Sequence, residues 1–459
     1  MENRRTVLFV STAAAFLTPF MGSSLNIALP TIGREFSMTA VALGWVATSY
    51  LLAAAIGLVP FGRIADMTGR AAIFTWGSLV YTVSAVLSTV AGSAAFLLIT
   101  RALQGIGGAM VMSTGVAILT AAYPPSERGR VLGINVSSTY LGLSLGPVLG
   151  GFLTQNLGWR SIFWINGFCG LAVFVLAITK LKDENHEPQK ERFDIPGSVL
   201  LALSLTGIML GLSRLPKPAG IGLLAGGLVC LAAFVRVERS SPAPLLDIAL
   251  FRSNSVFAFS NLAALINYCA TAAVGFLLSL YLQEVKGLDP QKAGLVLIAQ
   301  PVMMALFSPL AGRLSDRIEP RYLASGGMGL SVIGLALLAL VGSPTAIPLV
   351  SAVLVVLGLG FALFSSPNTN AVMSSVERNR YGIASATLGT MRFTGQMLSM
   401  GVAMLIFALY LGRARITPET APQFLAAQRT AFIFFAALCL AGVFASLKRG
   451  HIRNGVTAK

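Results

Sequence analysis

Two charged motifs recur along the chain at one fixed separation. The sequence GRIAD at positions 62–66 returns as GRLSD at 312–316, and ERGR at 127–130 returns as ERNR at 377–380, each 250 residues later. A carboxylate among arginines can form ion pairs that one conformation makes and another breaks. We therefore predict that these segments are gating loops, with the residues Gly62, Arg63, Asp66, Arg70, Gly312, Arg313, Asp316 and Arg317.

Two further arginines, Arg101 and Arg392, interrupt long apolar runs. A charge at membrane depth is costly unless it meets water or a partner, so each predicts a wet cavity. Gln104 follows Arg101 by three residues, which places both on one face of a helix. An alternative for Arg101 is that its side chain extends to the headgroups or binds carbonyl groups in the bundle.

Other polar side chains in apolar runs are candidates for the same cavity. Packing within or between helices is an equally good explanation for any single one of them. The predicted cavity residues are Asn26, Tyr50, Arg101, Gln104, Tyr140, Asn267, Gln300, Asn370, Arg392 and Gln396.

The elements that carry these residues are predicted to be membrane helices. Of 459 residues, 55% are hydrophobic and only 11% are charged, against about 25% charged in soluble domains. Runs of about 20 apolar residues mark the spans. We predict fourteen, at 7–29, 40–61, 71–91, 94–121, 130–154, 161–180, 195–213, 219–236, 255–282, 290–311, 321–341, 347–370, 381–411 and 430–448.

Composition also excludes other classes. The formal charge of +16 would suggest a nucleic-acid partner in a soluble protein, but here most of the basic residues fall in segments on one side of the predicted spans, which predicts that both termini are cytoplasmic. The four cysteines lie in separate apolar runs and both histidines in polar segments. We therefore expect no metal, no cofactor, no nucleic acid and no enzyme activity.

The repeats define the predicted domains. Spans one to six correspond to spans nine to fourteen, and two spans are left between them. The predicted divisions are an N-terminal six-helix bundle (1–181), a charged linker with two extra helices (182–254), a C-terminal six-helix bundle (255–449) and a cytoplasmic tail (450–459). The first span is read as an uncleaved helix because it is too long for a signal peptide.

Span five has a glycine pattern of its own. Gly142, Gly146 and Gly150 recur every four residues and allow close approach of another helix, while Pro147 weakens the local hydrogen bonds. Gly151 extends the same motif. The sequence GLSLG at 142–146 also matches a hydrolase pattern, but it lacks the strand-turn-helix context that such a nucleophile needs.

Four motifs together resemble the major facilitator superfamily, and the span number is similar to its fourteen-helix drug:proton antiporter family. They are GRIADMTGR at 62–70, RALQGIGG at 101–108, GPVLGG at 146–151 and WRSIFWIN at 159–166. The resemblance implies an all-α major facilitator fold in the plasma (inner) membrane, formed by two six-helix bundles plus two additional central helices. It also implies alternating access, export of small amphipathic compounds, proton coupling and a monomer.

The chain departs from that family near the end of span one, where the family carries an acid and this sequence has Met21. The acids nearest to the predicted core are Glu35 and Glu284, which are the remaining candidates for proton sites. Without a carboxylate in the spans, neutral, amphipathic or anionic substrates gain support over cations. The alternatives are a lipid or metabolite facilitator without proton coupling, and a membrane scaffold or sensor that transports nothing.

Overall fold

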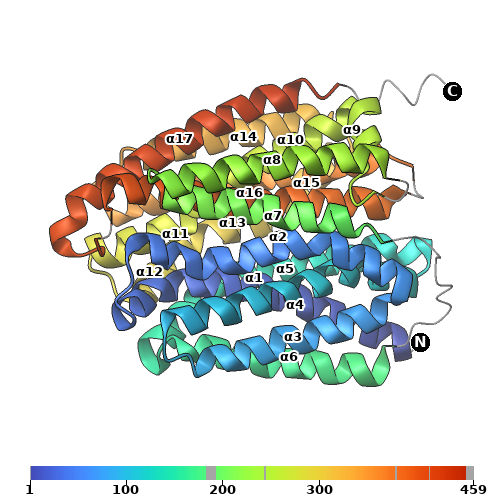
Figure 1. The fold of residues 1–459 in the computed structure, drawn as a ribbon, viewed down its shortest axis with the longest axis horizontal. Helices are drawn as coiled ribbons and strands as arrows, with labels where there is room; N and C mark the ends of the chain where they lie inside the picture. The colour runs from blue at the N-terminus through green and yellow to red at the C-terminus, as the bar shows by residue number, and fades with distance from the viewer. Residues whose placement is uncertain (1, 182–192, 242–243, 378–379, 413, 451–459) are drawn as a thin grey trace.

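The computed structural model describes residues 2–181, 193–241, 244–377, 380–412 and 414–450. Most of the predicted linker, the tail beyond residue 450 and part of the second ERNR motif lie outside these ranges. Within them, fourteen helices are long and apolar enough to cross a membrane, which confirms the predicted number. They run side by side along the length of the molecule (Figure 1).

The helices follow the predicted order. The first bundle consists of α1 (Glu2–Glu35), α2 (Ala40–Thr68), α3 (Arg70–Thr89), α4 (Ala94–Ala122), α5 (Pro125–Leu157) and α6 (Arg160–Lys180). The extra pair is α7 (Ile195–Arg214) and α8 (Pro218–Ser240), and the short α9 (Ile248–Ser253) follows. The second bundle consists of α10 (Ser255–Thr271), α11 (Ala273–Leu280), the π-helical turn η1 (Tyr281–Val285), α12 (Pro290–Leu297), α13 (Ala299–Ser315), α14 (Pro320–Leu338), α15 (Ile347–Ser374), α16 (Tyr381–Tyr410), the 3-10 turn η3 (Pro418–Thr420) and α17 (Ala421–Leu447).

α1 begins and α17 ends at the same end of the molecule, called here the terminal end; the opposite end is the far end (Figure 1). Several chain reversals have local causes. The hydroxyl of Thr39 accepts a hydrogen bond from Ala42 N at the start of α2, and Ser93 does the same for Phe96 N at the start of α4. Gly69, with φ of 114°, separates α2 from α3 at the terminal end.

Several predicted boundaries were wrong. The predicted first span stops before Pro30, but α1 continues to Glu35 with Pro30 inside it. A proline leaves the carbonyl four residues earlier without its helical donor. Here that carbonyl, of Asn26, accepts a hydrogen bond of 2.6 Å from Ser279 Oγ of α11. This hydrogen bond between the two bundles therefore replaces the helical hydrogen bond that Pro30 cannot donate.

The ninth and tenth spans are each interrupted, which the sequence did not indicate. At the break between α10 and α11, Ala273 N donates to Ser399 Oγ of α16 at 3.0 Å instead of to the helix. The last predicted span starts too late, because α17 already begins at Ala421 and contains Arg429. Polar residues at a helix end lower the apolar signal without ending the helix.

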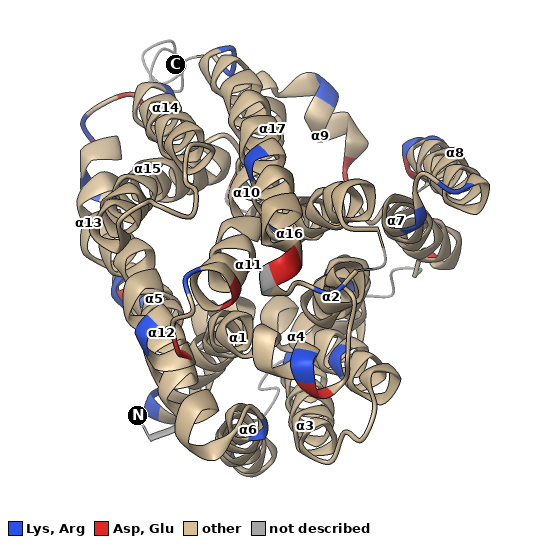
Figure 2. Cartoon of the chain, turned by 90° about the vertical axis from the view of Figure 1, so that its left-hand side faces the viewer, with Lys and Arg blue, Asp and Glu red and all other residues tan. Residues whose placement is uncertain are grey.

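The extra pair is central only in sequence. α7 and α8 pack against each other, and α7 alone joins the pair to α2 and α16. Figure 2 shows the pair at the side of the molecule, with α1, α2, α11 and α16 near the middle. Residues that face those inner helices are therefore the candidates for a transport site.

Candidate functional site

Arg101 of α4 is fully buried and held by several groups at once. Its Nε donates to the Val46 carbonyl of α2 at 3.2 Å, and its Nη1 donates to Gln104 Oε1 at 2.5 Å. Its guanidinium carbon lies 4.7 Å from the centre of the Tyr50 ring. These bonds exclude the extension of Arg101 to the headgroups and leave the alternative in which it binds groups inside the bundle.

Two glycines of α4 explain why this arrangement fits. A Cβ atom at Gly108 would lie 2.6 Å from the Tyr50 hydroxyl, and one at Gly105 would overlap the Tyr50 carbonyl. The RALQGIGG motif therefore combines a cation with the space for the aromatic ring that covers it.

Arg392 of α16 is the arginine that the sequence predicts for the second bundle, on a helix that does not correspond to α4 in the repeat. It lies eleven residues from the start of its helix, or about 16 Å along the axis. Its guanidinium carbon lies 5.4 Å from the centre of the Tyr268 ring of α10. It is also within electrostatic range of Tyr50 and Tyr140, so the arginines of the two bundles share one aromatic surrounding.

Several polar atoms on α2, α4, α10, α13 and α16 are buried without a hydrogen-bond partner. Asn267, which is completely buried beside Tyr268, has neither its amide nitrogen nor its amide oxygen bonded. Unbonded buried polar groups are expensive, and they point to water or a ligand at the site. The other atoms of this kind are Tyr50 Oη, Gln104 Nε2, Arg392 Nε and Ser308 Oγ. Tyr268 and Ser308 are the members of this cluster that the sequence analysis missed.

Not every predicted cavity residue belongs to this cluster. Asn370 lies near the terminal end of α15, where its Nδ2 donates to Ser315 Oγ at 2.9 Å and its Oδ1 accepts from Ser374. Its prediction as a central residue was wrong, because its amide joins α15 to α13. Asn26 lies at the contact of α1 with α11, its Nδ2 facing Gly275.

Tyr140, Gln300 and Gln396 remain candidates. Tyr140 is partly buried and within range of Arg392 and Ser308. Gln396 follows Arg392 by one helical turn on α16. Gln300 lies in the first turn of α13, where its backbone carbonyl contacts Gly358 of α15.

Met21 is buried among apolar side chains. Its side chain is 1% exposed, within the main apolar cluster, while its neighbour Gly22 is exposed with open space at its Cβ position. Restoring the family's acid at Met21 would therefore bury a carboxylate among apolar groups.

The two bundles are closed tightly at the far end. A Cβ atom at Gly151 of α5 would lie 2.5 Å from the Pro290 carbonyl of α12, and one at Gly294 of α12 would overlap the Pro147 carbonyl. Gln283 Nε2 adds a hydrogen bond of 2.9 Å to the Ile27 carbonyl of α1. The remaining glycines of the predicted motif, Gly142, Gly146 and Gly150, instead contact α1 within the first bundle.

This arrangement of two similar bundles around a shared polar cluster agrees with the comparison to known families. The family model of the Major Facilitator Superfamily matches residues 12–400 and 260–454. The chain belongs to the major facilitator superfamily. It is therefore a secondary transporter, and the predicted fold and family are confirmed.

Relatives within the superfamily have different transport activities. Riboflavin transporter RibZ of Clostridioides difficile (strain 630) is 30% identical over 446 residues, which cover 96% of this chain and 97% of that protein. Multidrug resistance protein Stp of Mycobacterium tuberculosis (strain ATCC 25618 / H37Rv) is 30% identical over 418 residues, covering 90% and 77%. The crystal structure of a bacterial homolog to the human lysosomal transporter Spinster, in an inward-facing and unoccupied conformation, matches with a TM-score of 0.71 at 16% identity over 97% of both chains.

The superfamily's signature motif is not a loop in this chain. Residues 62–68 form the last two turns of α2, and residues 312–315 end α13. The predicted loops were wrong because charged residues near a helix end lower the apolar signal without ending the helix, and α2 ends only at Thr68, before Gly69. Asp66 pairs with Arg70 at 2.8 Å across Gly69, and Arg63 Nη2 donates to the Pro244 carbonyl at 3.0 Å.

Neutralising this motif is expected to slow transport without unfolding the protein. Asp66 and Arg70 are 41% and 43% exposed, so Asp66→Asn should change the free energy of unfolding by less than about 1 kcal/mol. If the pair stabilises one state of the cycle, turnover should fall about tenfold. Asp316→Asn in the repeat should act similarly. Wild-type turnover by both variants, in a flux assay with matched amounts of inserted protein, would contradict gating.

The acids predicted as proton sites lie at the far end. Glu35 accepts from Trp159 Nε1 at 2.6 Å and forms an ion pair of 2.7 Å with Arg160, while Glu284 is partly buried in η1. A third acid, Glu238 in the last turn of α8, was not among the predicted proton sites, although its side chain is only 3% exposed.

A further basic residue, which was not among the predicted sites, lies inside the helical bundle. Arg449, just after α17, is completely buried and donates to Asn368 Oδ1 at 3.1 Å and to the Ser446 hydroxyl. It closes the terminal end of the second bundle. The end of the last helix was expected to be exposed, but Arg449 there is part of the protein interior.

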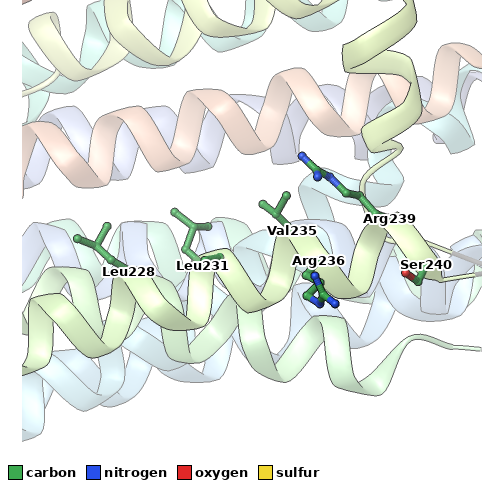
Figure 3. Close-up of a pocket in the computed structure, with 7 residues that line it drawn as sticks. Leu228, Leu231, Val235, Arg236, Arg239 and Ser240 are labelled. Carbon is green, nitrogen blue, oxygen red and sulfur yellow. The ribbon is translucent and has the colours of Figure 1, made fainter.

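A separate groove of about 590 Å³ runs along α8, away from the arginine cluster. Figure 3 shows Leu228, Leu231 and Val235 along its apolar part, with Arg236 and Arg239 toward the terminal end. Only 17% of the apolar window of α8 is buried, so we assign this groove to the membrane-facing surface.

Proposed function

We propose that this protein exports small amphipathic compounds of neutral or anionic character across the plasma (inner) membrane by alternating access, in exchange for protons. The orientation with both termini in the cytoplasm follows from the distribution of basic residues. We further propose that it works as a monomer, with the divisions 1–181, 182–254, 255–449 and 450–459.

The charge of the central cluster supports the substrate class. Arg101 and Arg392 form no ion pair with a carboxylate in the described part of the chain. A cationic compound would meet two positive charges and no negative one, which is unfavourable at low dielectric. A compound with an acceptor or an anionic group would instead find donors, and its apolar part would find the rings of Tyr50, Tyr140 and Tyr268.

The single observation that carries the proposal is the set of unbonded polar atoms on both bundles. Asn267 and Arg392 belong to the second bundle, and Tyr50 and Gln104 to the first. A substrate that bonds to both sides would hold the bundles together around itself, and its release would let them separate. That is the requirement of alternating access.

The test is a flux measurement in proteoliposomes with a panel of neutral, anionic and cationic amphipathic compounds, each with and without a proton gradient. We expect transport of neutral or anionic members that increases with the gradient. Efficient export of monovalent cationic dyes alone would contradict the proposed substrate class. If export of cationic dyes is lost when Glu35 and Glu284 are neutralised, the dyes bind instead in a vestibule at the far end.

Replacing Arg392 with glutamine separates charge from shape. Hydrogen bonds to charged groups contribute about 1.5–3 kcal/mol, so Arg392→Gln should reduce transport of anionic compounds about 10- to 100-fold. Transport of neutral compounds of the same size should change far less. The ratio of the two fluxes is the measurement, and an unchanged ratio would show that Arg392 does not face the substrate.

A second candidate is a metabolite facilitator without proton coupling. It is favoured by the absence of a carboxylate from the described central cluster, because such a group usually links the proton to the substrate. RibZ, which covers nearly the whole chain, is a transporter of a metabolite rather than of a drug. Flux that is independent of the proton gradient would decide for this candidate.

A further inference from the structure

A second set of buried polar groups lies at the terminal end of the extra helix pair. Glu238 of α8 is 3% exposed, and its Oε1 has no hydrogen-bond partner. Asp194, which caps the start of α7 through a 2.8 Å bond from Gly197 N to its Oδ1, has its other oxygen, Oδ2, buried and without a partner. The two helices therefore each bring an unsatisfied carboxyl oxygen to the same place.

Gly197 shows how close the two groups are. A Cβ atom on Gly197 would lie 2.6 Å from Glu238 Oε1 and 2.9 Å from Asp194 Oδ2, so both oxygens border the same small space. Two ionised carboxylates that border the same space repel each other, and one oxygen of each, Asp194 Oδ2 and Glu238 Oε1, has no donor. A single proton bound between them removes the repulsion and supplies the missing donor.

Among the residues that the structure describes, one basic side chain acts on this pair. Arg63 at the end of α2 is within electrostatic range of Glu238, but it donates to the Pro244 carbonyl. Arg236 and Arg239 of α8 are exposed and line the outer groove. The remaining acid nearby, Asp247 at the start of α9, is occupied by an ion pair, described next.

Residues 244–247, called here the strap, connect this pair to both bundles. Pro244 accepts the hydrogen bond from Arg63 of the first bundle, and Leu246 N donates to Glu238 Oε2 at 3.0 Å. Asp247 forms an ion pair of 3.3 Å with Arg380, just before α16 of the second bundle. The same four residues thus touch the signature motif, the carboxyl pair and the second bundle.

We propose that Asp194 and Glu238 form a proton-binding site on the terminal side, and that the proton bound there holds the strap in place between the two bundles. The role of this site in coupling transport to protons rests on the proposed function. The existence of the site does not. When the proton leaves, the two carboxylates repel and Glu238 attracts Arg63 away from Pro244. The strap is then released, and the bundles separate more easily at the terminal end.

The first experiment needs no transported substrate, so it stays informative if the proposed function fails. Infrared difference spectra of the purified full-length protein, recorded while the pH is raised, should show a protonated carboxyl band that disappears. The band should be missing from Glu238→Gln and from Asp194→Asn, which keeps a capping side chain. Glu419→Gln, at an exposed acid of the far end, should retain it.

The second experiment tests coupling. With the pH varied on the terminal side only, wild-type flux should change by up to about tenfold per pH unit across the titration, the limit for one proton. Glu238→Gln, which mimics the protonated state, should lose this dependence. A wild-type protein without a titrating band, or a band retained in Glu238→Gln, overturns the site. A wild-type pH dependence retained in Glu238→Gln overturns its role in coupling.

Discussion

Arg101→Ala should reduce transport at least about a hundredfold, because it removes two charged hydrogen bonds of about 1.5 kcal/mol or more each. The bonds are those to the Val46 carbonyl and to Gln104, and the Tyr50 ring loses its cation at the same time. Gln104 and Tyr50 carry two of the unbonded atoms of the central cluster. Without Arg101, the side chains of Gln104 and Tyr50 lose their orientation toward the substrate, and the flux assay would detect the resulting loss of transport.

The lysine variant separates charge from geometry. A lysine keeps the charge but has neither the planar fork nor the stacking surface of arginine, so Arg101→Lys should recover only a small part of the activity. Arg252→Ala, at an exposed arginine of α9, serves as the control and should transport normally. Thermal unfolding of all three variants distinguishes lost transport from lost folding. Full activity of the alanine variant would show that Arg101 has no part in the cycle.

Gly294→Ala should reduce transport about 5- to 150-fold by holding the bundles apart at the far end. A Cβ atom there overlaps the Pro147 carbonyl, which is backbone and cannot turn away as a side chain would. Overpacking of this kind costs about 1–3 kcal/mol, enough to shift a balanced equilibrium between two states about 5- to 150-fold. Gly151→Ala, on the opposite helix of the same contact, should act in the same direction.

The readout is the distance between spin labels at Asn156 of α5 and Gln291 of α12, both exposed, in a protein whose native cysteines are replaced. The two variants should lengthen this distance and slow flux together. Gly133→Ala in α5 is the matched control, because open space surrounds its Cβ position. An unchanged distance in Gly294→Ala would mean that the far-end contact is not a gate.

Properties that depend on local sequence were predictable. The number of spans follows from apolar length, since each span must be about as long as the membrane is thick. The pairing of the two bundles follows from the repeated motifs. The importance of Arg101 follows from the cost of a charge in an apolar run, and its helix neighbour Gln104 follows from helical spacing.

Contacts between distant segments were not predictable. Asn370 and Asn267 look alike in the sequence, yet one is bonded to Ser315 and the other has no partner. Arg449 seemed to be the end of a helix but is buried by groups from α10, α15 and α17. Which polar group finds a partner depends on how the helices are packed and rotated, and a single sequence does not contain that information.

The sequence by itself therefore determined the class, the span number, the duplication and the burial of Arg101. The repeated motifs show the duplication, and the others follow from the energy of placing residue types in a membrane. Only the tertiary structure decided where the two bundles touch and which polar atoms remain unbonded. It also brought Asp194 and Glu238 to the same glycine. These two acids are 44 residues apart, and the periodicity of neither helix indicates the other. Their proximity arises from the antiparallel packing of α7 against α8, which joins the start of one helix to the end of the other.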